Sequence, residues 1–317
     1  MDKQSKIYIA GHRGMVGSAI WRALEASGYN NLVGQTSAEL DLRNQSAVQA
    51  FIETTKPDVI IDAAAKVGGI LANSQYQFEF LLENMQIQNN LIDVAHKQNI
   101  SKFIFLGSSC IYPKLATQPL KEEYLLTGPL EPTNDGYAIA KISGVRLCKA
   151  IRDQYQKDFV SLMPTNLYGP HDNFDLKSSH VLPAMIRKFH EAKLNNNATV
   201  TLWGGSGSPM REFLHVEDMA QAVVFALENK LPEHLYNVGT GTDITIKNLA
   251  ETVQRIVGHQ GTIVWDDTKP DGTPRKLMDV SKMKTLGWQA TTPLDQGIEN
   301  TYNWFLSNEA SYKQVKL

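Results

Sequence analysis

Residues 7–17 read Ile7-Tyr8-Ile9-Ala10-Gly11-His12-Arg13-Gly14-Met15-Val16-Gly17, four hydrophobic residues followed directly by three glycines spaced three apart. The hydrophobic run is typical of a buried strand, and an amphipathic helical pattern begins at Val16. Glycines at such a junction permit a tight turn and let the backbone approach a pyrophosphate, which the helix N-terminus can bind. The alternative is a glycine-rich turn without a ligand. The strand before the glycines and the helix after them favour dinucleotide binding.

The same alternation of strand and helix continues through the first half of the chain. Runs rich in β-branched residues predict strands at Leu32–Gln35, Val59–Ala63, Phe103–Gly107 and Phe159–Met163. Amphipathic stretches predict helices at Val16–Ser27, Gln45–Thr54, Gln75–Gln98 and Ala138–Gln156. Strands that alternate with helices form a parallel sheet with helices on both faces. We therefore expect an α/β fold, a Rossmann-type doubly wound parallel sheet.

The second half of the chain does not continue this regular alternation of strand and helix. The polar stretch from Tyr168 to Ser179 predicts a long loop, and loops of that length are usually functional or disordered. Further elements are predicted at Leu182–Ala192, Val200–Trp203, Met219–Glu228, Leu235–Val238, Lys247–Val257 and Leu294–Leu306. Since no linker divides the chain, we expect a dinucleotide-binding domain in residues 1–165, with residues around 215–240 returning to it. Residues 166–317 are expected to form mainly a smaller, interwoven substrate lobe.

Composition excludes several classes of function. The 317 residues are 42% hydrophobic and 20% charged, with a net charge of -2 and no basic run that would indicate nucleic acid. The two cysteines, Cys110 and Cys148, cannot form a disulfide framework, and no Cys/His cluster has the spacing of a metal site. The polar start of the chain and the lack of a long apolar run predict neither a signal peptide nor a membrane span. We expect a soluble cytoplasmic protein without a metal.

The second strand indicates which nicotinamide cofactor the loop binds. NAD sites usually have an acid on the ribose about 20 residues after the glycines, whereas this strand ends Gly34-Gln35-Thr36-Ser37. Arg13 could instead meet a 2′-phosphate, which favours NADP. Glu39 and Asp41 are nearby acids, and Asp41 is expected to face the adenine edge or to cap the next helix.

A pair of polar residues predicts proton transfer. Tyr137 and Lys141 lie four residues apart, on one face of a predicted helix, and a lysine cation lowers the pKa of a nearby phenol. Such a tyrosine can exchange a proton with a carbonyl or alcohol oxygen. Ser108 follows a predicted strand, at the edge of the sheet where ligands bind, and can hydrogen-bond the same oxygen.

Together these features resemble the extended short-chain dehydrogenase/reductase family, whose signature joins a TGxxGxxG-like loop, a strand-end Ser or Thr and YxxxK. Ala10 stands where the family has Thr, with no catalytic consequence. Other segments are similar to members of that family that act on GDP-sugars, so the resemblance covers nearly the whole chain. These segments are Gly107–Pro113, Asn166–Phe174, Ser179–Pro183, Pro209–Val216 and Lys269–Lys276.

The resemblance implies a two-stage reaction that uses NADPH. A GDP-4-keto-6-deoxy-D-mannose would be epimerised at C3 and C5, with Cys110 in the base-like role and His180 in the acid-like role. Thiols and imidazoles have ordinary pKa values of about 8.5 and 6.5, which suits proton shuttling near neutral pH. The C4 ketone would then be reduced, with Tyr137 protonating the alkoxide. Without the family context, Cys110 would be interpreted as a core residue and His180 as a loop or capping residue.

The resemblance also assigns binding residues. Those expected at the cofactor are Gly11, His12, Arg13, Gly14, Met15, Val16, Gly17, Asp41, Leu106, Gly107, Ser108, Ser109, Tyr137, Lys141, Pro164, Thr165, Asn166, Leu167 and His180. Those expected at the GDP-sugar are Lys188, Trp203, Arg211 and Asp271. The loop between Trp203 and Arg211 is one residue longer than the family's usual spacing. Arg275 and Lys276 are either solvated charges or nucleotide contacts.

Other functions fit part of the pattern. A 4-epimerase or 4,6-dehydratase of the same scaffold keeps NAD bound, but the dehydratase needs an Asp-Glu pair that Ser108–Tyr112 lacks. A non-catalytic dinucleotide sensor would typically have lost Tyr137 or Lys141. The amphipathic helix predicted at Gln75–Gln98 resembles those that pair in family dimers, so a homodimer is expected.

Overall fold

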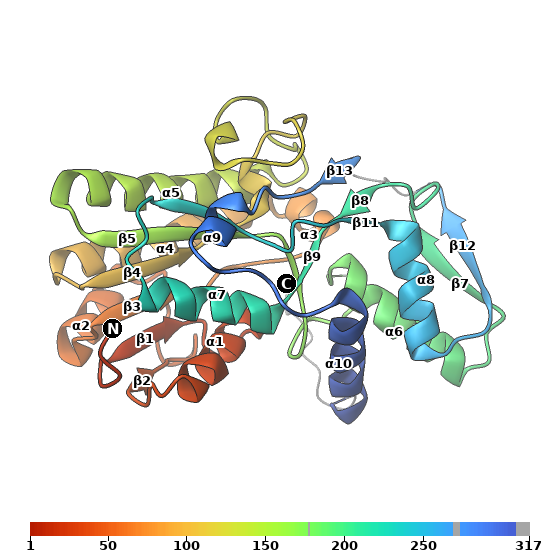
Figure 1. Ribbon diagram of the computed structural model, residues 1–317, viewed down its shortest axis with the longest axis horizontal. Coiled ribbons are helices and arrows are strands. Elements are labelled where there is room, and N and C mark those ends of the chain that lie inside the picture. The colour runs from red at the N-terminus through yellow and green to blue at the C-terminus, as the bar shows by residue number, and fades with distance from the viewer. Residues whose placement is uncertain (177, 269–272, 309–317) are drawn as a thin grey trace.

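Figure 1 shows the computed structural model, which describes residues 1–176, 178–268 and 273–308. Within these ranges the central sheet has six parallel strands in the order β10-β5-β4-β3-β1-β2. Their bounds are β1 (Ile7–Ala10), β2 (Leu32–Val33), β3 (Val59–Asp62), β4 (Lys102–Leu106), β5 (Asp158–Pro164) and β10 (Leu235–Val238). The chain runs outward from β1 to β2 in one direction and from β3 to β5 in the other. This order confirms the predicted doubly wound sheet.

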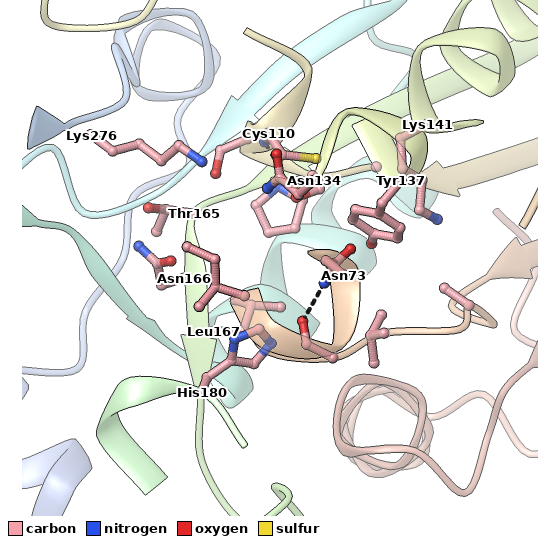
Figure 2. A pocket seen from close by; sticks show the side chains of 18 of the residues that line it. Asn73, Cys110, Asn134, Tyr137, Lys141, Thr165, Asn166, Leu167, His180 and Lys276 are labelled. Atoms are coloured by element: carbon pink, nitrogen blue, oxygen red, sulfur yellow. Dashed lines mark hydrogen bonds between the residues drawn. The ribbon is translucent and has the colours of Figure 1, made fainter. Parts of the chain in front are cut away.

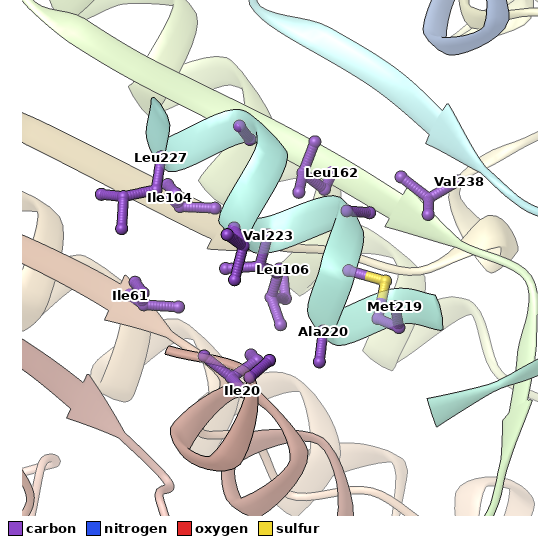
Figure 3. Close-up of a cluster of buried hydrophobic side chains, with 14 of the residues drawn as sticks. Ile20, Ile61, Ile104, Leu106, Leu162, Met219, Ala220, Val223, Leu227 and Val238 are labelled. Atoms are coloured by element: carbon purple, nitrogen blue, oxygen red, sulfur yellow. The ribbon is translucent and has the colours of Figure 1, made fainter. Parts of the chain in front are cut away.

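Helices cover both faces of the sheet. α1 (Met15–Ala26) and α7 (Val216–Glu228) cover one face, and α2 (Gln45–Thr55), α4 (Gln77–Lys97) and α5 (Asp135–Tyr155) cover the other. Since side chains alternate between faces along a strand, Ile61 packs toward α1 and α7, whereas Ile60 packs toward α4 and α5. Figure 3 shows Val223 and Leu227 of α7 packed beside Ile104 of β4. Residues far beyond 165 therefore complete the core of the sheet.

The remaining elements form a smaller lobe beside the carboxyl ends of the strands (Figure 1). They are β6 (Asn166–Tyr168), α6 (Val181–Leu194), β7 (Thr199–Trp203), β8 (Met210–Arg211), β9 (Phe213–His215), β11 (Ile244–Thr245), α8 (Ile246–Val257), β12 (Thr262–Asp266), β13 (Arg275–Lys276) and α10 (Leu294–Ser307). α9 (Ser281–Thr285) contacts β10. Ile186, Leu249 and Phe305 belong to a separate hydrophobic core between α6, α8 and α10. The lobe is interwoven with the sheet, as predicted, and the domain boundary at residue 165 stays a prediction.

The structure differs from the predicted elements in local details. The helix predicted at Gln75–Gln98 is α4, and a short helix that was not predicted, α3 (Ile70–Gln75), precedes it; Tyr76 between them has non-helical angles, φ −121° and ψ 41°. The second strand ends at Val33, two residues earlier than predicted. Within the described residues, the loop between Tyr168 and His180 contains no helix or strand. Across the described ranges, every helix is too short or too polar to cross a membrane.

Candidate active site

A cavity of about 540 Å³ lies at the carboxyl ends of the central strands, with the lobe as its far wall (Figure 2). This is the crevice where open parallel sheets bind ligands. Most residues predicted for the site meet there. Those lining the cavity are Gly14, Met15, Val16, Leu106, Gly107, Ser108, Ser109, Cys110, Tyr137, Lys141, Pro164, Thr165, Asn166, Leu167, His180 and Arg211.

The glycine loop is shaped as an anion site at the start of α1. Gly11 has a φ of 78°, and its carbonyl accepts a hydrogen bond of 2.9 Å from the Gly14 N–H, which closes the turn. A Cβ atom at Gly17 would lie 2.1 Å from the Gly11 carbonyl oxygen, so α1 can approach the turn only with glycine there. The first turn of α1 has no acidic residue, and no side chain caps it. The helix N-terminus therefore fits the pyrophosphate of a dinucleotide.

The tip of β2 forms a corner beside the glycine loop. A Cβ atom at Gly34 would lie 2.4 Å from the His12 ring, so the ring needs glycine there. The Thr36 N–H donates to the Glu39 carboxylate at 2.8 Å and lowers the Glu39 pKa, which the positive charge of Arg13 lowers further. Arg13 and Glu39 thus face the same corner.

Asp41 lies outside the cavity lining. Its carboxylate pairs with the Arg43 guanidinium at 2.9 Å. The side chain that caps α2 belongs to Asn44, whose Oδ1 accepts from the Ala47 N–H at 3.1 Å. The capping interpretation of Asp41 is therefore wrong, and its contact with a cofactor stays a prediction.

Tyr137 and Lys141 project from α5 into the cavity (Figure 2). Lys141 Nζ lies 5.9 Å from the centroid of the Tyr137 ring and donates to the Leu106 carbonyl at 2.9 Å. Burial raises the pKa of Tyr137, and the negative charges that Cys110 and Asp62 can carry raise it further. The net direction is opposite to the lowering expected from the sequence: burial is the largest cause of the rise, and Lys141 is not among the groups that shift this pKa. The phenol is therefore held protonated, the state that a proton donor requires.

Ser108 and Cys110 lie in a short turn just after β4. Ser108 Oγ accepts a hydrogen bond of 3.4 Å from the Cys110 N–H, and the Cys110 side chain is 6% exposed. Burial raises the pKa of the Cys110 thiol, whereas the positive charge of Lys276 and the Ser108 hydroxyl lower it. Figure 2 shows the Lys276 ammonium reaching into the same side of the cavity. The thiol is thus neutral at rest, with a cation near enough to favour its ionised form.

His180 lies directly before α6, at the side of the cavity opposite Cys110 (Figure 2). Desolvation lowers the pKa of its imidazole, so the ring is neutral near physiological pH. A thiol and an imidazole on opposite sides of one cavity can reach opposite faces of a sugar ring.

Glu212 joins the lobe to the central sheet. Its carboxylate is fully buried and accepts hydrogen bonds from the N–H groups of Thr240, Gly241 and Met278 at 2.6, 2.7 and 2.8 Å. Its carbonyl accepts from the Asn166 side chain at 2.7 Å. Met278 belongs to the crossing segment (residues 273–279), which pairs with β8 and also with Leu120. This network holds the segment that carries Lys276 over the cavity.

The residues predicted at the GDP-sugar are not all at the cavity. Arg211 lines it, and burial lowers the Arg211 pKa. Lys188 and Trp203 lie outside the lining, with Lys188 Nζ 5.8 Å from the Trp203 ring and bonded to the Thr201 carbonyl at 2.9 Å. Asp271 lies outside the described residues.

Sequence reasoning missed several cavity residues. Asn73 of α3 lines the cavity, with its side-chain NH₂ bonded to the Gly68 carbonyl at 2.7 Å. Asn134 and Asp172 also line it. The Asn73 segment follows the carboxyl end of β3, and that position was a usable signal. Lys276 lines the cavity, and Arg275 at its rim pairs with Asp243 at 2.6 Å; a nucleotide contact by either residue stays a prediction. The described residues contain no group of three or more His, Cys, Asp or Glu placed to hold a metal ion.

The chain matches the model of a known protein family. Residues 7–239 match the model of the NAD dependent epimerase/dehydratase family. The chain belongs to this family. The matched region runs from β1 to the residue after β10 and so includes every strand of the central sheet.

Individual relatives match over nearly their whole lengths. The chain is 56% identical to "Putative GDP-L-fucose synthase 2" of Arabidopsis thaliana, covering 99% of this chain and 95% of that protein. It is 52% identical to the GDP-L-fucose synthase of Escherichia coli (strain K12), covering 99% and 100%.

Solved structures agree with this family. A GDP-mannoheptose C4 reductase from Campylobacter jejuni with NADP bound is 39% identical, with a TM-score of 0.88 over 96% of this chain and 99% of that one. A GDP-L-fucose synthetase from Naegleria fowleri bound to NADP is 29% identical, with a TM-score of 0.91 over 99% and 96%.

Proposed function

We propose that the chain catalyses the reaction of a GDP-L-fucose synthase. It would invert C3 and C5 of GDP-4-keto-6-deoxy-D-mannose and then reduce the C4 ketone with NADPH to give GDP-L-fucose. One observation carries the proposal: Cys110, Tyr137 and His180 line one cavity in a chain 52% identical over its length to the E. coli enzyme of that name.

The glycine loop would hold the cofactor. The turn of Gly11 to Gly17 and the uncapped N-terminus of α1 fit its pyrophosphate. When bound, the cofactor would supply the hydride for C4. Arg13 would meet the 2′-phosphate at the corner beside Gly34, where the His12 ring packs against the backbone. Two relatives with NADP bound support the choice of NADP over NAD.

Tyr137 would complete the reduction. Its raised pKa keeps the phenol protonated, so it can give a proton to O4 as the alkoxide forms. Ser108 would hydrogen-bond the same oxygen. Lys141, fixed to the Leu106 carbonyl, would place a positive charge beside the phenol and stabilise the phenolate left behind.

Cys110 and His180 would perform the inversions. A base removes the proton from the carbon next to the ketone, and an acid returns a proton to the opposite face. Hydrogen bonds from Ser108 and Tyr137 to O4 would stabilise the intervening enolate. Because the Cys110 pKa is raised, the base-like role requires its thiolate, whose formation the Lys276 charge favours. His180 lies across the cavity, where it can reach the other face, and its acid-like role requires its imidazolium form, which burial disfavours.

The diphosphate of the substrate would extend toward the lobe. Arg211, desolvated at the cavity wall, would bind it, since guanidinium groups bind phosphates well. Lys188, Trp203 and Asp271 stay proposed contacts of the nucleotide, Trp203 by stacking on the base.

A single incubation tests the proposed function. The protein is given GDP-4-keto-6-deoxy-D-mannose and NADPH, and the stereochemistry at C3, C4 and C5 is assigned by NMR. The proposal requires stoichiometric NADPH oxidation and the L-fuco product. Reduction without inversion would indicate a C4 reductase like the C. jejuni relative, and turnover without NADPH consumption would indicate an epimerase that keeps NAD bound.

We also propose that the protein is a homodimer formed through α4 and α5. These helices pack on each other and leave apolar side chains exposed, with Phe78 70%, Leu82 39% and Ile139 46% accessible. Exposed apolar side chains on adjacent helices are suited to a second copy of the same face.

A further inference from the structure

Asp62, the last residue of β3, is an unusual buried acid. Its side chain is 0% exposed, and one carboxylate oxygen accepts a hydrogen bond of 3.2 Å from the Ala64 N–H. Within the described residues, the other oxygen, Oδ2, is buried without a hydrogen-bond partner. Burying a carboxylate in this way is costly unless an opposite charge compensates it.

The strand register shows what surrounds the carboxylate. Ile60, two residues before Asp62, packs into the core on the α4 and α5 side of the sheet, so Asp62 points to that side as well. Phe105 of β4 is its partner on the next strand. Lys141 Nζ lies 4.8 Å from the centroid of the Phe105 ring and is bonded to the carbonyl of the following residue, Leu106. The ammonium of Lys141 therefore lies over the strand next to Asp62.

The other titratable groups that interact with Asp62 are neutral. They are the phenols of Tyr8 on β1 and of Tyr137 on α5, and the thiol of Cys148, also on α5; the pKa of each is raised by burial. Lys141 is thus the group of this set that brings a positive charge to the carboxylate.

We propose that Asp62 is a positioning residue for the reduction, and that its carboxylate is the buried counter-charge that keeps Lys141 protonated beside Tyr137. This inference depends on the proposed function. A lysine in an apolar site tends to lose its proton. A neutral amine would not stabilise the Tyr137 phenolate, so Tyr137 would be a weaker proton donor to O4 of the sugar.

The titration of the two groups agrees with the geometry. Burial lowers the pKa of Lys141, and the negative charges that Asp62 and, to a smaller extent, Cys110 can carry raise it again. Burial raises the pKa of Asp62 to about 6, even though Lys141 lowers it. Asp62 is therefore ionised near neutral pH, and its negative charge opposes the loss of the Lys141 proton. Since Asp62 raises the pKa values of both Lys141 and Tyr137, its loss lowers both.

The test is the pH profile of NADPH oxidation with GDP-4-keto-6-deoxy-D-mannose, measured for wild type, Asp62→Asn and Asp58→Asn. Reduction needs protonated Tyr137 and Lys141, so Asp62→Asn should move the alkaline limb of kcat to lower pH by about one unit or more. Asp58, exposed just before the other end of β3 and bonded to the Lys6 N–H, is the matched control and should leave the limb in place. An unshifted limb in an active Asp62→Asn enzyme overturns the inference, whereas an inactive wild type overturns the proposed function instead.

A second measurement does not depend on turnover. Unfolding free energies are compared for wild type, Asp62→Leu, Lys141→Met and the double variant, without cofactor. Leucine suits the apolar surroundings if asparagine does not fold. If the two charges are a pair, removing both should cost less than the sum of the two single losses. Additive losses would show two independent groups and would contradict the proposal.

Discussion

Lys141 and Leu106 are joined by a hydrogen bond of 2.9 Å from the lysine Nζ to the leucine carbonyl oxygen. The bond connects α5, which carries Tyr137, to the end of β4, which is followed by Ser108. The bond therefore ties the helix that carries Tyr137 to the strand that precedes Ser108, the two residues proposed to act on O4. Separate steps of the reaction can be tested against this arrangement.

Tyr137→Phe should separate the two stages. Without the phenol hydroxyl the alkoxide at C4 has no proton donor, so we expect kcat for NADPH oxidation to fall by about 10²–10⁴-fold. Exchange of solvent deuterium into C3 and C5, followed by NMR, should persist at a reduced rate. Loss of exchange to the same extent as reduction would place Tyr137 in the inversions as well.

The Cys110 thiol should give the exchange a characteristic pH dependence. Because its pKa is raised, the thiolate fraction, and with it the exchange rate, should grow about tenfold per pH unit below that pKa. Cys110→Ser should suppress exchange. Lys276→Met should slow it at a fixed pH, about tenfold for each unit by which the thiol pKa rises, and exchange that is insensitive to both changes would remove the thiol from the mechanism.

Arg13→Ala should alter cofactor choice. Arg13 lies at the corner beside Glu39, and loss of an arginine–phosphate contact costs about 1.5–3 kcal/mol. We expect KM for NADPH to rise by roughly 10- to 100-fold and KM for NADH to stay nearly constant, measured with the same keto-sugar. Equal changes in both values would place Arg13 at the pyrophosphate rather than at the 2′-phosphate.

Asp172 should make the cofactor-free protein less stable as pH rises. Burial raises its pKa to about 7 from 3.8, so between these values the folded state binds more protons than the unfolded state, and stability falls with increasing pH. The effect amounts to at most about 4 kcal/mol and is complete above the folded pKa. Asp172→Asn keeps the acceptor for the Asn173 N–H and should lose less stability in urea titrations from about pH 4 to 8. Parallel curves for the two proteins would contradict this account.

Phe78→Glu tests the dimer. A charge on the exposed face of α4 should convert a dimer to a monomer, as measured by light scattering. Leu115→Glu is the control, since Leu115 is 87% exposed and belongs to a loop outside α4 and α5. A monomeric wild-type protein would contradict the proposed homodimer.

Local patterns predicted most of the sheet and the half of the site that lies on it. Gly11, Ser108 and Tyr137 each follow or begin a periodic element, so their neighbours in sequence already indicate where they lie. The short helix α3 and the two-residue strands β8, β11 and β13 were missed because so few residues do not establish a periodic pattern.

The rest of the site depends on contacts between distant parts of the chain. Lys276 and Cys110 line the same cavity although 166 residues separate them in the sequence (276 minus 110). The position of Lys276 results from the pairing of β13 with β8. Asp62 shares the pattern of an ordinary strand-end acid. The role proposed for Asp62 depends on Lys141, which lies on a helix. A single sequence does not specify how that helix is rotated about its axis.

The placement of α7 has a consequence for how the protein is made. When residue 165 has been synthesised, Ile104, Leu106, Val160 and Leu162 present one face of the sheet, but the helix that covers it begins at Val216. Translation must add 51 more residues (216 minus 165), which takes several seconds at about 5–20 residues per second. During that time the nascent chain displays an apolar surface. A gene truncated after residue 165 would leave that surface exposed permanently and yield an aggregating product.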